Sequence, residues 1–238
     1  MVVSLPNLLM TATMSTLPKL EVWRLLVDGP ASPARNMAVD EALLREVREP
    51  VLRLYEWSVP AVSIGYFQPA ALAGERPVIR RYTGGGLVDH AHDLTYTIVL
   101  PRAHPWMELS APESYRAIHQ GIRNILDACN IFCELVPAAY EVESDACFQK
   151  PVLFDLVAGR QKISGAAQRR TRQGLLHQGS ILLPDPRLNS EVRSVFADFF
   201  PGHLETDFHD SILTPAEAAR AADLERDRYA TDAWNRSR

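Results

Sequence analysis

Cysteine is scarce in this sequence: three residues in 238, at positions 129, 133 and 147. An odd number without a secretory signal argues against a disulfide framework and favours a reducing, cytoplasmic setting. Cys129 and Cys133 are four residues apart, which could place them on one helical face. No Cys-x-x-Cys or His-x-x-x-His pattern accompanies them, so we expect buried thiols there and no zinc site.

Long apolar runs and an excess of positive charge are also missing. No segment approaches the roughly 20 apolar residues needed to cross a bilayer. The net charge of −4 argues against a general nucleic-acid binder. We therefore expect no membrane and no nucleic acid among the partners. The segment 1–20 has no early Lys or Arg and is interrupted by Pro6 and Asn7, so we expect a disordered leader and not a secretory signal.

The composition, with 47% hydrophobic and 23% charged residues, is typical of a globular protein. A capping box, Ser110 to Glu113, predicts a helix, and Thr214 to Glu217 predicts another near the end. Strand-like runs are joined mostly by hairpins, at 22–29, 51–57, 61–67, 78–82, 93–101, 153–157, 161–170 and 175–183. This pattern predicts an α+β fold, a mixed and largely antiparallel sheet flanked by helices. We expect one catalytic domain over 21–184 and a helical appendage over 185–238.

Three elements carry residues that suggest chemistry. The first, RRYTGGGLVDH (80–90), has three consecutive glycines whose backbone N–H groups could bind an anion or an acyl carbonyl, or simply form a tight turn. It matches neither a Walker loop nor a Rossmann fingerprint. The second, GRQKISGAAQRR (159–170), places Lys162 beside small residues, where it could enter a pocket or remain a solvated edge lysine. The third, LLHQGSILL (175–183), contains His177, either a wall or proton-transfer residue or a hydrogen-bonded core histidine.

Taken together, these motifs resemble the lipoate side of the biotin/lipoate protein ligase superfamily. The resemblance covers residues 22–183, and the segment NMAVDEALL (36–44) is similar to the first helix of that family. The biotin-ligase loop G-R-G-R-x-G-R is absent. The resemblance implies a mixed sheet flanked by helices, related to the class II aminoacyl-tRNA synthetase and biotin synthetase fold. It also implies an enzyme that attaches an octanoyl or lipoyl group to a lysine of a carrier domain.

Two chemistries are known on this fold: acyl transfer through a cysteine thioester, and ATP-dependent ligation of a free acid. The residue that bears on the choice between them is Cys147, in SDACFQKP (144–151). The run resembles cysteine-dependent octanoyltransferases of the LipM type, which implies catalysis by Cys147 and Lys162 with no cofactor. A lysine near the thiol would favour the thiolate. The triplet Gly84–Gly86 instead resembles lipoate–protein ligase A, which implies ATP and magnesium. A non-catalytic binder of lipoylated proteins, or an amidotransferase between carriers, is a further alternative.

The resemblance also implies the partners and the remaining site residues. The expected partners are acyl carrier protein as octanoyl donor and lipoyl domains or the glycine-cleavage H protein as acceptors. The basic run with Arg169, Arg170 and Arg172 could dock such acidic carriers, or form a solvated turn. No metal ligands are expected in the protein. The expected substrate-binding residues are Arg81, Thr83, Gly84, Gly85, Gly86, His90, Asp155, Gly165, Ala167, His177 and Gly179.

Overall fold

The computed structural model describes residues 21–137, 151–183, 185–204 and 206–237, and the predicted leader lies outside them. Within these residues an eight-stranded sheet has the order β11-β1-β2-β6-β10-β9-β8-β7, and a three-stranded sheet has the order β4-β3-β5. The strands are β1 (Glu21–Ala31), β2 (Val51–Trp57), β3 (Val62–Ile64), β4 (Val78–Arg80), β5 (Val88–Asp89), β6 (Leu94–Pro101), β7 (Glu134–Leu135), β8 (Leu156–Ala158), β9 (Gln161–Arg170), β10 (Gly174–Ile181) and β11 (Thr206–Asp210). The helices are α1 (Pro33–Glu46), η1 (Ala70–Ala73), η2 (Pro105–Met107), α2 (Ala111–Ala128), η3 (Pro186–Leu188), α3 (Asn189–Leu204), α4 (Pro215–Leu224), η4 (Glu225–Tyr229) and α5 (Asp232–Asn235).

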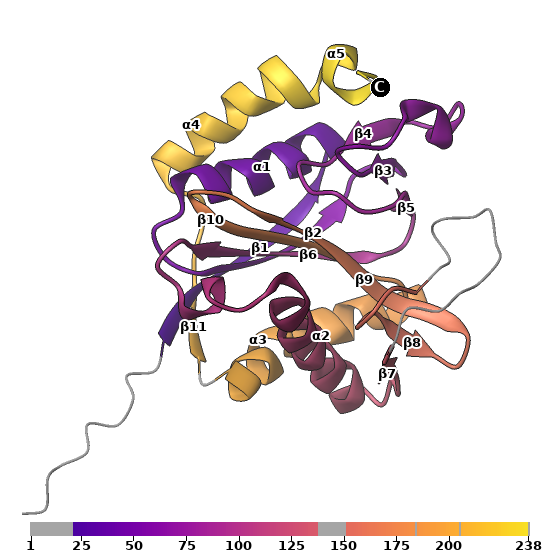
Figure 1. The fold of residues 1–238 in the computed structure, drawn as a ribbon, viewed down its shortest axis with the longest axis vertical. Coiled ribbons are helices and arrows are strands. Elements are labelled where there is room, and N and C mark those ends of the chain that lie inside the picture. The colour runs from indigo at the N-terminus through magenta and orange to yellow at the C-terminus, as the bar shows by residue number, and fades with distance from the viewer. Residues whose placement is uncertain (1–20, 138–150, 184, 205, 238) are drawn as a thin grey trace, which may run out of the picture.

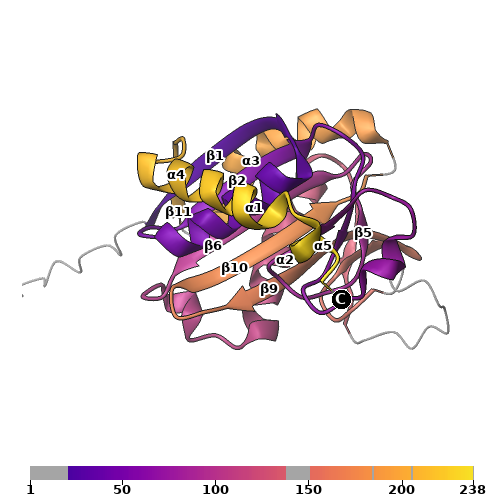
Figure 2. The same ribbon diagram turned by 90° about the horizontal axis from the view of Figure 1, so that it is seen from above.

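Helices cover both faces of the large sheet, which confirms the predicted fold class. Figure 1 shows α1 and α4 on one face and α2 and α3 on the other. Seen from above, α4 lies alongside α1 (Figure 2). The pairs β1–β11 and β1–β2 are parallel, and the remaining pairs of the large sheet are antiparallel.

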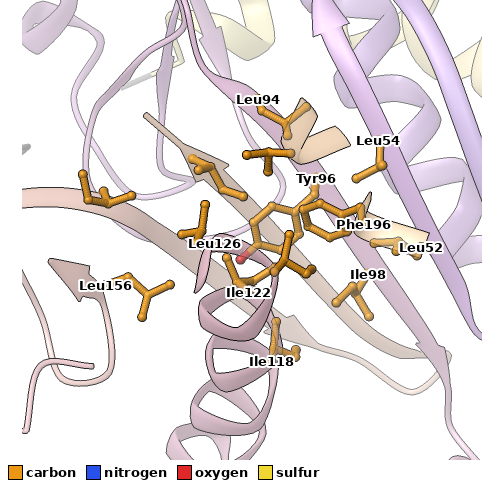
Figure 3. Close-up of a cluster of buried hydrophobic side chains, with 14 of the residues drawn as sticks. Leu52, Leu54, Leu94, Tyr96, Ile98, Ile118, Ile122, Leu126, Leu156 and Phe196 are labelled. Atoms are coloured by element: carbon orange, nitrogen blue, oxygen red, sulfur yellow. The ribbon is translucent and has the colours of Figure 1, made fainter. Parts of the chain in front are cut away.

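Strand β6 lies in the middle of the large sheet, and both of its faces are covered. Seven of its eight residues are buried. Tyr96 and Ile98 point toward α2, where Ile118 and Ile122 pack on them (Figure 3). Val99 belongs to the core beneath α1. Thr95 and Thr97 alternate with these apolar residues, and although both threonines are buried, their hydroxyls donate to Asp93 and to Asp40.

Helix α2 forms where its sequence predicts it. The Ser110 side chain accepts a hydrogen bond from the amide of Glu113, and the Glu113 carboxylate accepts one from the amide of Ser110. This capping box satisfies two of the backbone donors left free at a helix start. The face bearing Ile118, Ile122 and Leu126 is fully buried. The helix therefore supplies one wall of the main core.

The segment after residue 185 is not the helical appendage that we expected. Strand β11 extends the large sheet by pairing parallel to β1, and α4 packs on α1. The Asn235 side chain accepts a hydrogen bond from the amide of Arg80 at 3.0 Å, next to the glycine loop. This integration was missed because β11, TDFHD, has one large apolar residue and no strand-like alternation. Its place is set by the edge of β1, whose free backbone groups pair with it.

No helix in the described part of the chain combines the length and apolarity needed to span a bilayer.

Candidate active site

A cavity of about 960 Å³ lies against the α1 face of the large sheet, with the small sheet and the glycine loop opposite. We call it the central cavity. Eight of the predicted site residues line it: Arg81, Gly85, Gly86, His90, Lys162, Gly165, Ala167 and Gly179. The sheets thus bring together motifs that are about 80 residues apart in the sequence. Cys147 lies outside the described residues, whereas Pro151 and Val152, which follow it closely, line the cavity.

Lys162 is anchored at this cavity by a buried carboxylate. Its ammonium Nζ lies 2.7 Å from Oδ2 of Asp155, which is fully buried. The same carboxylate accepts hydrogen bonds from the Tyr115 hydroxyl and from the amide of Val152. Burial, together with the adjacent Asp155 charge, raises the pKa of Tyr115 well above its usual value, so this hydroxyl stays a donor. The ammonium of Lys162 is consequently held in one position.

Gly165 is required for this arrangement. A Cβ atom at position 165 would lie closer than 3.0 Å to both Cε and Nζ of Lys162. It would also lie 3.1 Å from Oδ1 of Asp155. The glycine three residues after the lysine therefore leaves the space through which the lysine side chain passes. Asp155 itself is not among the residues that line the cavity, and its carboxylate contacts Lys162.

The glycine loop is packed tightly against the end of β3. Gly85 adopts φ +84°, a conformation that favours glycine. A Cβ at Gly65 would lie closer than 3.0 Å to the backbone of Gly84 and Gly85. Arg81 donates hydrogen bonds to the carbonyl oxygens of Gly84 and Gly86 and so fixes the loop from inside. Gly84 does not line the cavity, and its role is in this backbone contact.

Arg81 also brings positive charge to the cavity wall. Its third acceptor is the Ser63 hydroxyl, and all three acceptors are neutral oxygens. Burial lowers the pKa of Arg81 to about 10, so the guanidinium remains charged at neutral pH. A buried cation among neutral acceptors favours an anionic or strongly polarised group nearby.

His90 is held on three sides. Its Nδ1 lies 2.8 Å from Oδ2 of Asp93 and its Nε2 lies 2.6 Å from the Ser63 hydroxyl. Its ring stacks on the indole of Trp57, with centroids 4.0 Å apart. Burial opposes ionisation of Asp93, but His90 and the hydroxyls of Ser180 and Thr95 outweigh it and keep the pKa of Asp93 below its usual value. With Asp93 ionised, its carboxylate accepts a hydrogen bond from Nδ1 of His90.

His177 is not a wall residue, contrary to one of our two expectations. It points to the α2 face, opposite the cavity, with Nε2 3.2 Å from the Tyr96 hydroxyl and Nδ1 3.0 Å from the Gln168 amide. Burial lowers its pKa well below the usual value. It is therefore a neutral, hydrogen-bonded core histidine. Period-two alternation explains the outcome, because its neighbour Gln178 faces the cavity instead.

Thr83 contacts the site indirectly, through the side chain of Gln178. Its hydroxyl donates to Oε1 of Gln178 at 2.7 Å, and the Gln178 amide donates to Asp40 on α1 at 2.7 Å. Thr83 is fully buried and does not line the cavity. It holds Gln178, which does line the cavity.

Trp57, Ser63, Asp93 and Tyr115 are among the residues at or beside the site that were not predicted from the sequence. Asp93 carried a weak signal, since it follows His90 by three residues. Tyr115 carried none, because its contact with Asp155 joins α2 to a segment 40 residues later.

The basic run is not the free docking surface that we considered. Arg169 donates to the carbonyl of Tyr82 and lies 3.7 Å above that ring. Arg170 donates to the carbonyl of Met107 and the hydroxyl of Ser114. These two arginines brace neighbouring segments, which leaves Arg172 as the exposed member of the run.

Cys129 and Cys133 are buried free thiols, as predicted. Burial raises the pKa of both, to about 11 for Cys133. Within the described ranges, no group of three or more His, Cys, Asp or Glu side chains is arranged to hold a metal ion.

The sequence matches the family described as "Lipoyl protein ligase A/B catalytic domain" over residues 32–210. The octanoyltransferase LipM of Brevibacillus brevis is 34% identical, and the alignment covers 91% of this chain and 99% of that protein. A Thermoplasma acidophilum protein solved with bound lipoic acid aligns with a TM-score of 0.75 and 25% identity, over 90% of this chain and 98% of the other. A lipoate-protein ligase A bound with ATP aligns with a TM-score of 0.73 and 26% identity, over 90% and 98% of the two chains.

Proposed function

The chain belongs to the family of the lipoyl protein ligase A/B catalytic domain, an enzyme family, and we propose that it is an octanoyltransferase acting in protein lipoylation. It takes an octanoyl group from acyl carrier protein and transfers it to a lysine of a lipoyl domain or H protein. The identity to LipM octanoyltransferases along nearly the whole chain supports this choice. The observation that carries the proposal is the Lys162 ammonium, held by a buried carboxylate at the mouth of a large cavity.

The proposed reaction has two steps. The thiolate of Cys147 attacks the carbonyl carbon of the octanoyl thioester, and the thiolate of the donor carrier leaves and takes up a proton from solvent. The neutral amine of the acceptor lysine then attacks the Cys147 thioester. The new amide forms as the Cys147 thiolate leaves and the attacking nitrogen releases one proton to solvent.

Lys162 fits this chemistry as an electrostatic partner. A fixed ammonium favours a nearby thiolate over the thiol and stabilises negative charge on a carbonyl oxygen in the transition state. Because Asp155 and Tyr115 hold Lys162 before substrate arrives, little reorganisation is needed during the reaction. Arg81 and the glycine loop shape the wall that faces the acyl group.

The test is to incubate the protein with octanoyl acyl carrier protein in the absence of ATP and to measure its intact mass. We expect the mass to rise by one octanoyl group, and Cys147→Ser to abolish this gain. The matched controls are Cys129→Ser and Cys133→Ser, which retain the adduct because their raised pKa values leave little thiolate. An adduct that persists in Cys147→Ser, or none in the parent protein, would contradict the proposed thioester.

An ATP-dependent lipoate–protein ligase is the second candidate, favoured by the glycine triplet and the similarity to a ligase bound with ATP. Arg81, Arg160 and Lys162 line the cavity and offer positive charge suited to phosphate groups. No Asp or Glu is among the described lining residues, so that part of the wall offers no carboxylate for Mg²⁺. Modification of a lipoyl domain by free lipoate that requires ATP, without any octanoyl adduct, would establish this alternative.

A further inference from the structure

Helix α5 contacts the strand that leads into the glycine loop, although 154 positions separate the two in the sequence. Figure 1 shows α5 next to β4. The Trp234 indole N–H donates to the carbonyl oxygen of Arg80 at 3.0 Å, and the Arg80 amide donates to Oδ1 of Asn235 at 3.0 Å. The Arg80 guanidinium donates to the carbonyl oxygens of Trp234 at 3.1 Å and Asn235 at 3.2 Å. A helix leaves its last carbonyl groups without donors of its own, so the end of α5 is suited to bind this guanidinium.

Arg80 also contacts the turn that lies against the glycine loop. Its Nη1 donates to the carbonyl oxygens of Gly65, Tyr66 and Gln68 at 3.2, 3.1 and 2.6 Å. Gly65 packs on the backbone of the glycine loop, and the amide of Tyr66 donates to the carbonyl of Thr83 at 2.8 Å. Because Arg80 is buried, separating these segments would leave its donors unpaired, which is costly. Arg80 therefore joins α5 to the loop region.

Helix α5 is itself anchored to α1. Nδ2 of Asn235 donates to the carbonyl of Tyr229 at 2.8 Å, and the Tyr229 hydroxyl donates to the carboxylate of Glu41 on α1 at 2.6 Å. Arg228 donates to both oxygens of the same carboxylate, at 2.6 and 2.7 Å, and its guanidinium lies 4.5 Å above the ring of Trp234. Glu41 is fully buried, and charge-assisted hydrogen bonds to such a group are strong. The helix is thus a fixed support for whatever it contacts.

We propose that α5 holds the glycine loop in its binding conformation through Arg80, and that Trp234 and Asn235 are positioning residues for the acyl site. This inference rests on the proposed function, because it takes the central cavity as the site of the acyl group.

The consequence for catalysis follows from what each segment contributes to the cavity. The loop supplies Gly85 and Gly86 to the wall, and the side chain of Arg81 binds the loop from within the cavity. A loop that leaves this conformation part of the time lowers the apparent affinity in proportion to the fraction of competent protein. Lys162 is on β9, outside the contacts of α5, so the rate of the chemical step should change little. The affinity for the acyl donor is therefore the quantity that α5 controls.

The first measurement is amide hydrogen exchange, which needs no substrate. In Asn235→Ala, exchange within 80–90 should become about tenfold faster, because losing one buried hydrogen bond changes a local opening equilibrium by about that factor. Exchange within 159–170 should not change. Asn235→Asp retains an oxygen acceptor for the Arg80 amide and should restore slow exchange. Val192→Ala is the matched control, since this fully buried residue of α3 lies on the opposite face of the large sheet.

The second measurement is the kinetics of octanoyl transfer. Asn235→Ala should raise KM for octanoyl acyl carrier protein about tenfold while kcat stays within about twofold. Asn235→Asp and Val192→Ala should keep KM within about threefold of the parent value. A defect of stability alone would lower the amount of active protein, and with it the apparent kcat, without changing KM.

Unchanged exchange within 80–90 in Asn235→Ala overturns the proposal, and so does faster exchange with an unchanged KM. An equally raised KM in Val192→Ala overturns it as well. If Asn235→Ala gives no cooperative thermal transition, Trp234→Phe is measured, which keeps a ring and removes the indole donor to Arg80, with the same expected directions. A protein that forms no octanoyl adduct contradicts the proposed function instead, and the exchange experiment still shows whether α5 holds the loop.

Discussion

Gly165→Ala is expected to disable the protein by moving Lys162 while leaving the fold intact. The added methyl group would lie closer than 3.0 Å to Cε and Nζ of Lys162, a separation that real Cβ atoms essentially never show. The lysine must therefore move, because its far end is flexible and the strand backbone is not. Its ion pair with Asp155, 2.7 Å in the native protein, is then lost or lengthened.

The cost to stability should be small. Asp155 keeps its hydrogen bonds from the Tyr115 hydroxyl and the Val152 amide, so the buried carboxylate is not left without donors. Loss of one charge-assisted hydrogen bond lowers the free energy of unfolding by about 1.5–3 kcal/mol. Because Lys162 is partly exposed to solvent, we expect a loss of only about 1 kcal/mol for this variant. The effect on catalysis should be larger, because displacing a reacting group by about 1 Å can cost roughly 100-fold in rate.

The assay is kcat/KM for octanoyl transfer from acyl carrier protein to a lipoyl domain, with urea unfolding measured on the same preparations. Gly29→Ala is the matched control, since a Cβ there meets no atom within 4 Å. We expect about a 100-fold loss for Gly165→Ala and none for Gly29→Ala. Activity of Gly165→Ala within about threefold of the parent would refute the argument that the position of Lys162 controls the reaction.

Two further predictions concern the core behind the site. Gly179→Ala would place a Cβ closer than 3.0 Å to the fully buried ring of Tyr96. The free energy of unfolding should therefore fall by about 1–3 kcal/mol, which urea unfolding would show as a lower midpoint with an unchanged m-value. An unchanged midpoint would contradict this prediction. Burial lowers the pKa of His119 to about 4, below the ordinary 6.5, so the unfolded chain binds the proton first and the free energy of unfolding should fall by about 3 kcal/mol as pH drops from 6.5 to 4. His119→Gln should make that part of the stability profile less steep, the remaining slope including the contribution of buried His177, and a parent profile that is already flat there would show the reasoning to be wrong.

Local patterns predicted most of the framework. Apolar strand runs, a capping box and turn residues placed most of the elements close to their observed bounds, as with β2 at 51–57 and β10, predicted over 175–183 and observed at Gly174–Ile181. These signals are local because each depends on residues within one turn or one strand. The glycine loop and the K-I-S-G run were recognised for the same reason, and both line the central cavity.

The features that the sequence did not predict correctly depend on contacts between residues that are distant in the sequence. Strand β11 has no internal pattern, and its strand geometry comes from pairing with β1, about 180 residues earlier in the sequence. His177 was ambiguous because a strand alternates faces, and nothing within the strand says which face meets the cavity. Arg169 and Arg170 were considered as a docking surface because their acceptors, Tyr82 and Met107, are distant in the sequence.

The order of the motifs by itself determined the family, the fold class and the two principal candidates for catalysis, Lys162 and Cys147. Only the tertiary structure decided that Asp155 and Tyr115 hold Lys162, and that Trp57 stacks on His90 in the wall of the central cavity. The physical reason is that spacing along the chain encodes helix and strand periodicity, which act over a few residues. The position of a charge or a ring in a site depends on contacts between strands and helices whose separation in sequence carries no such regularity.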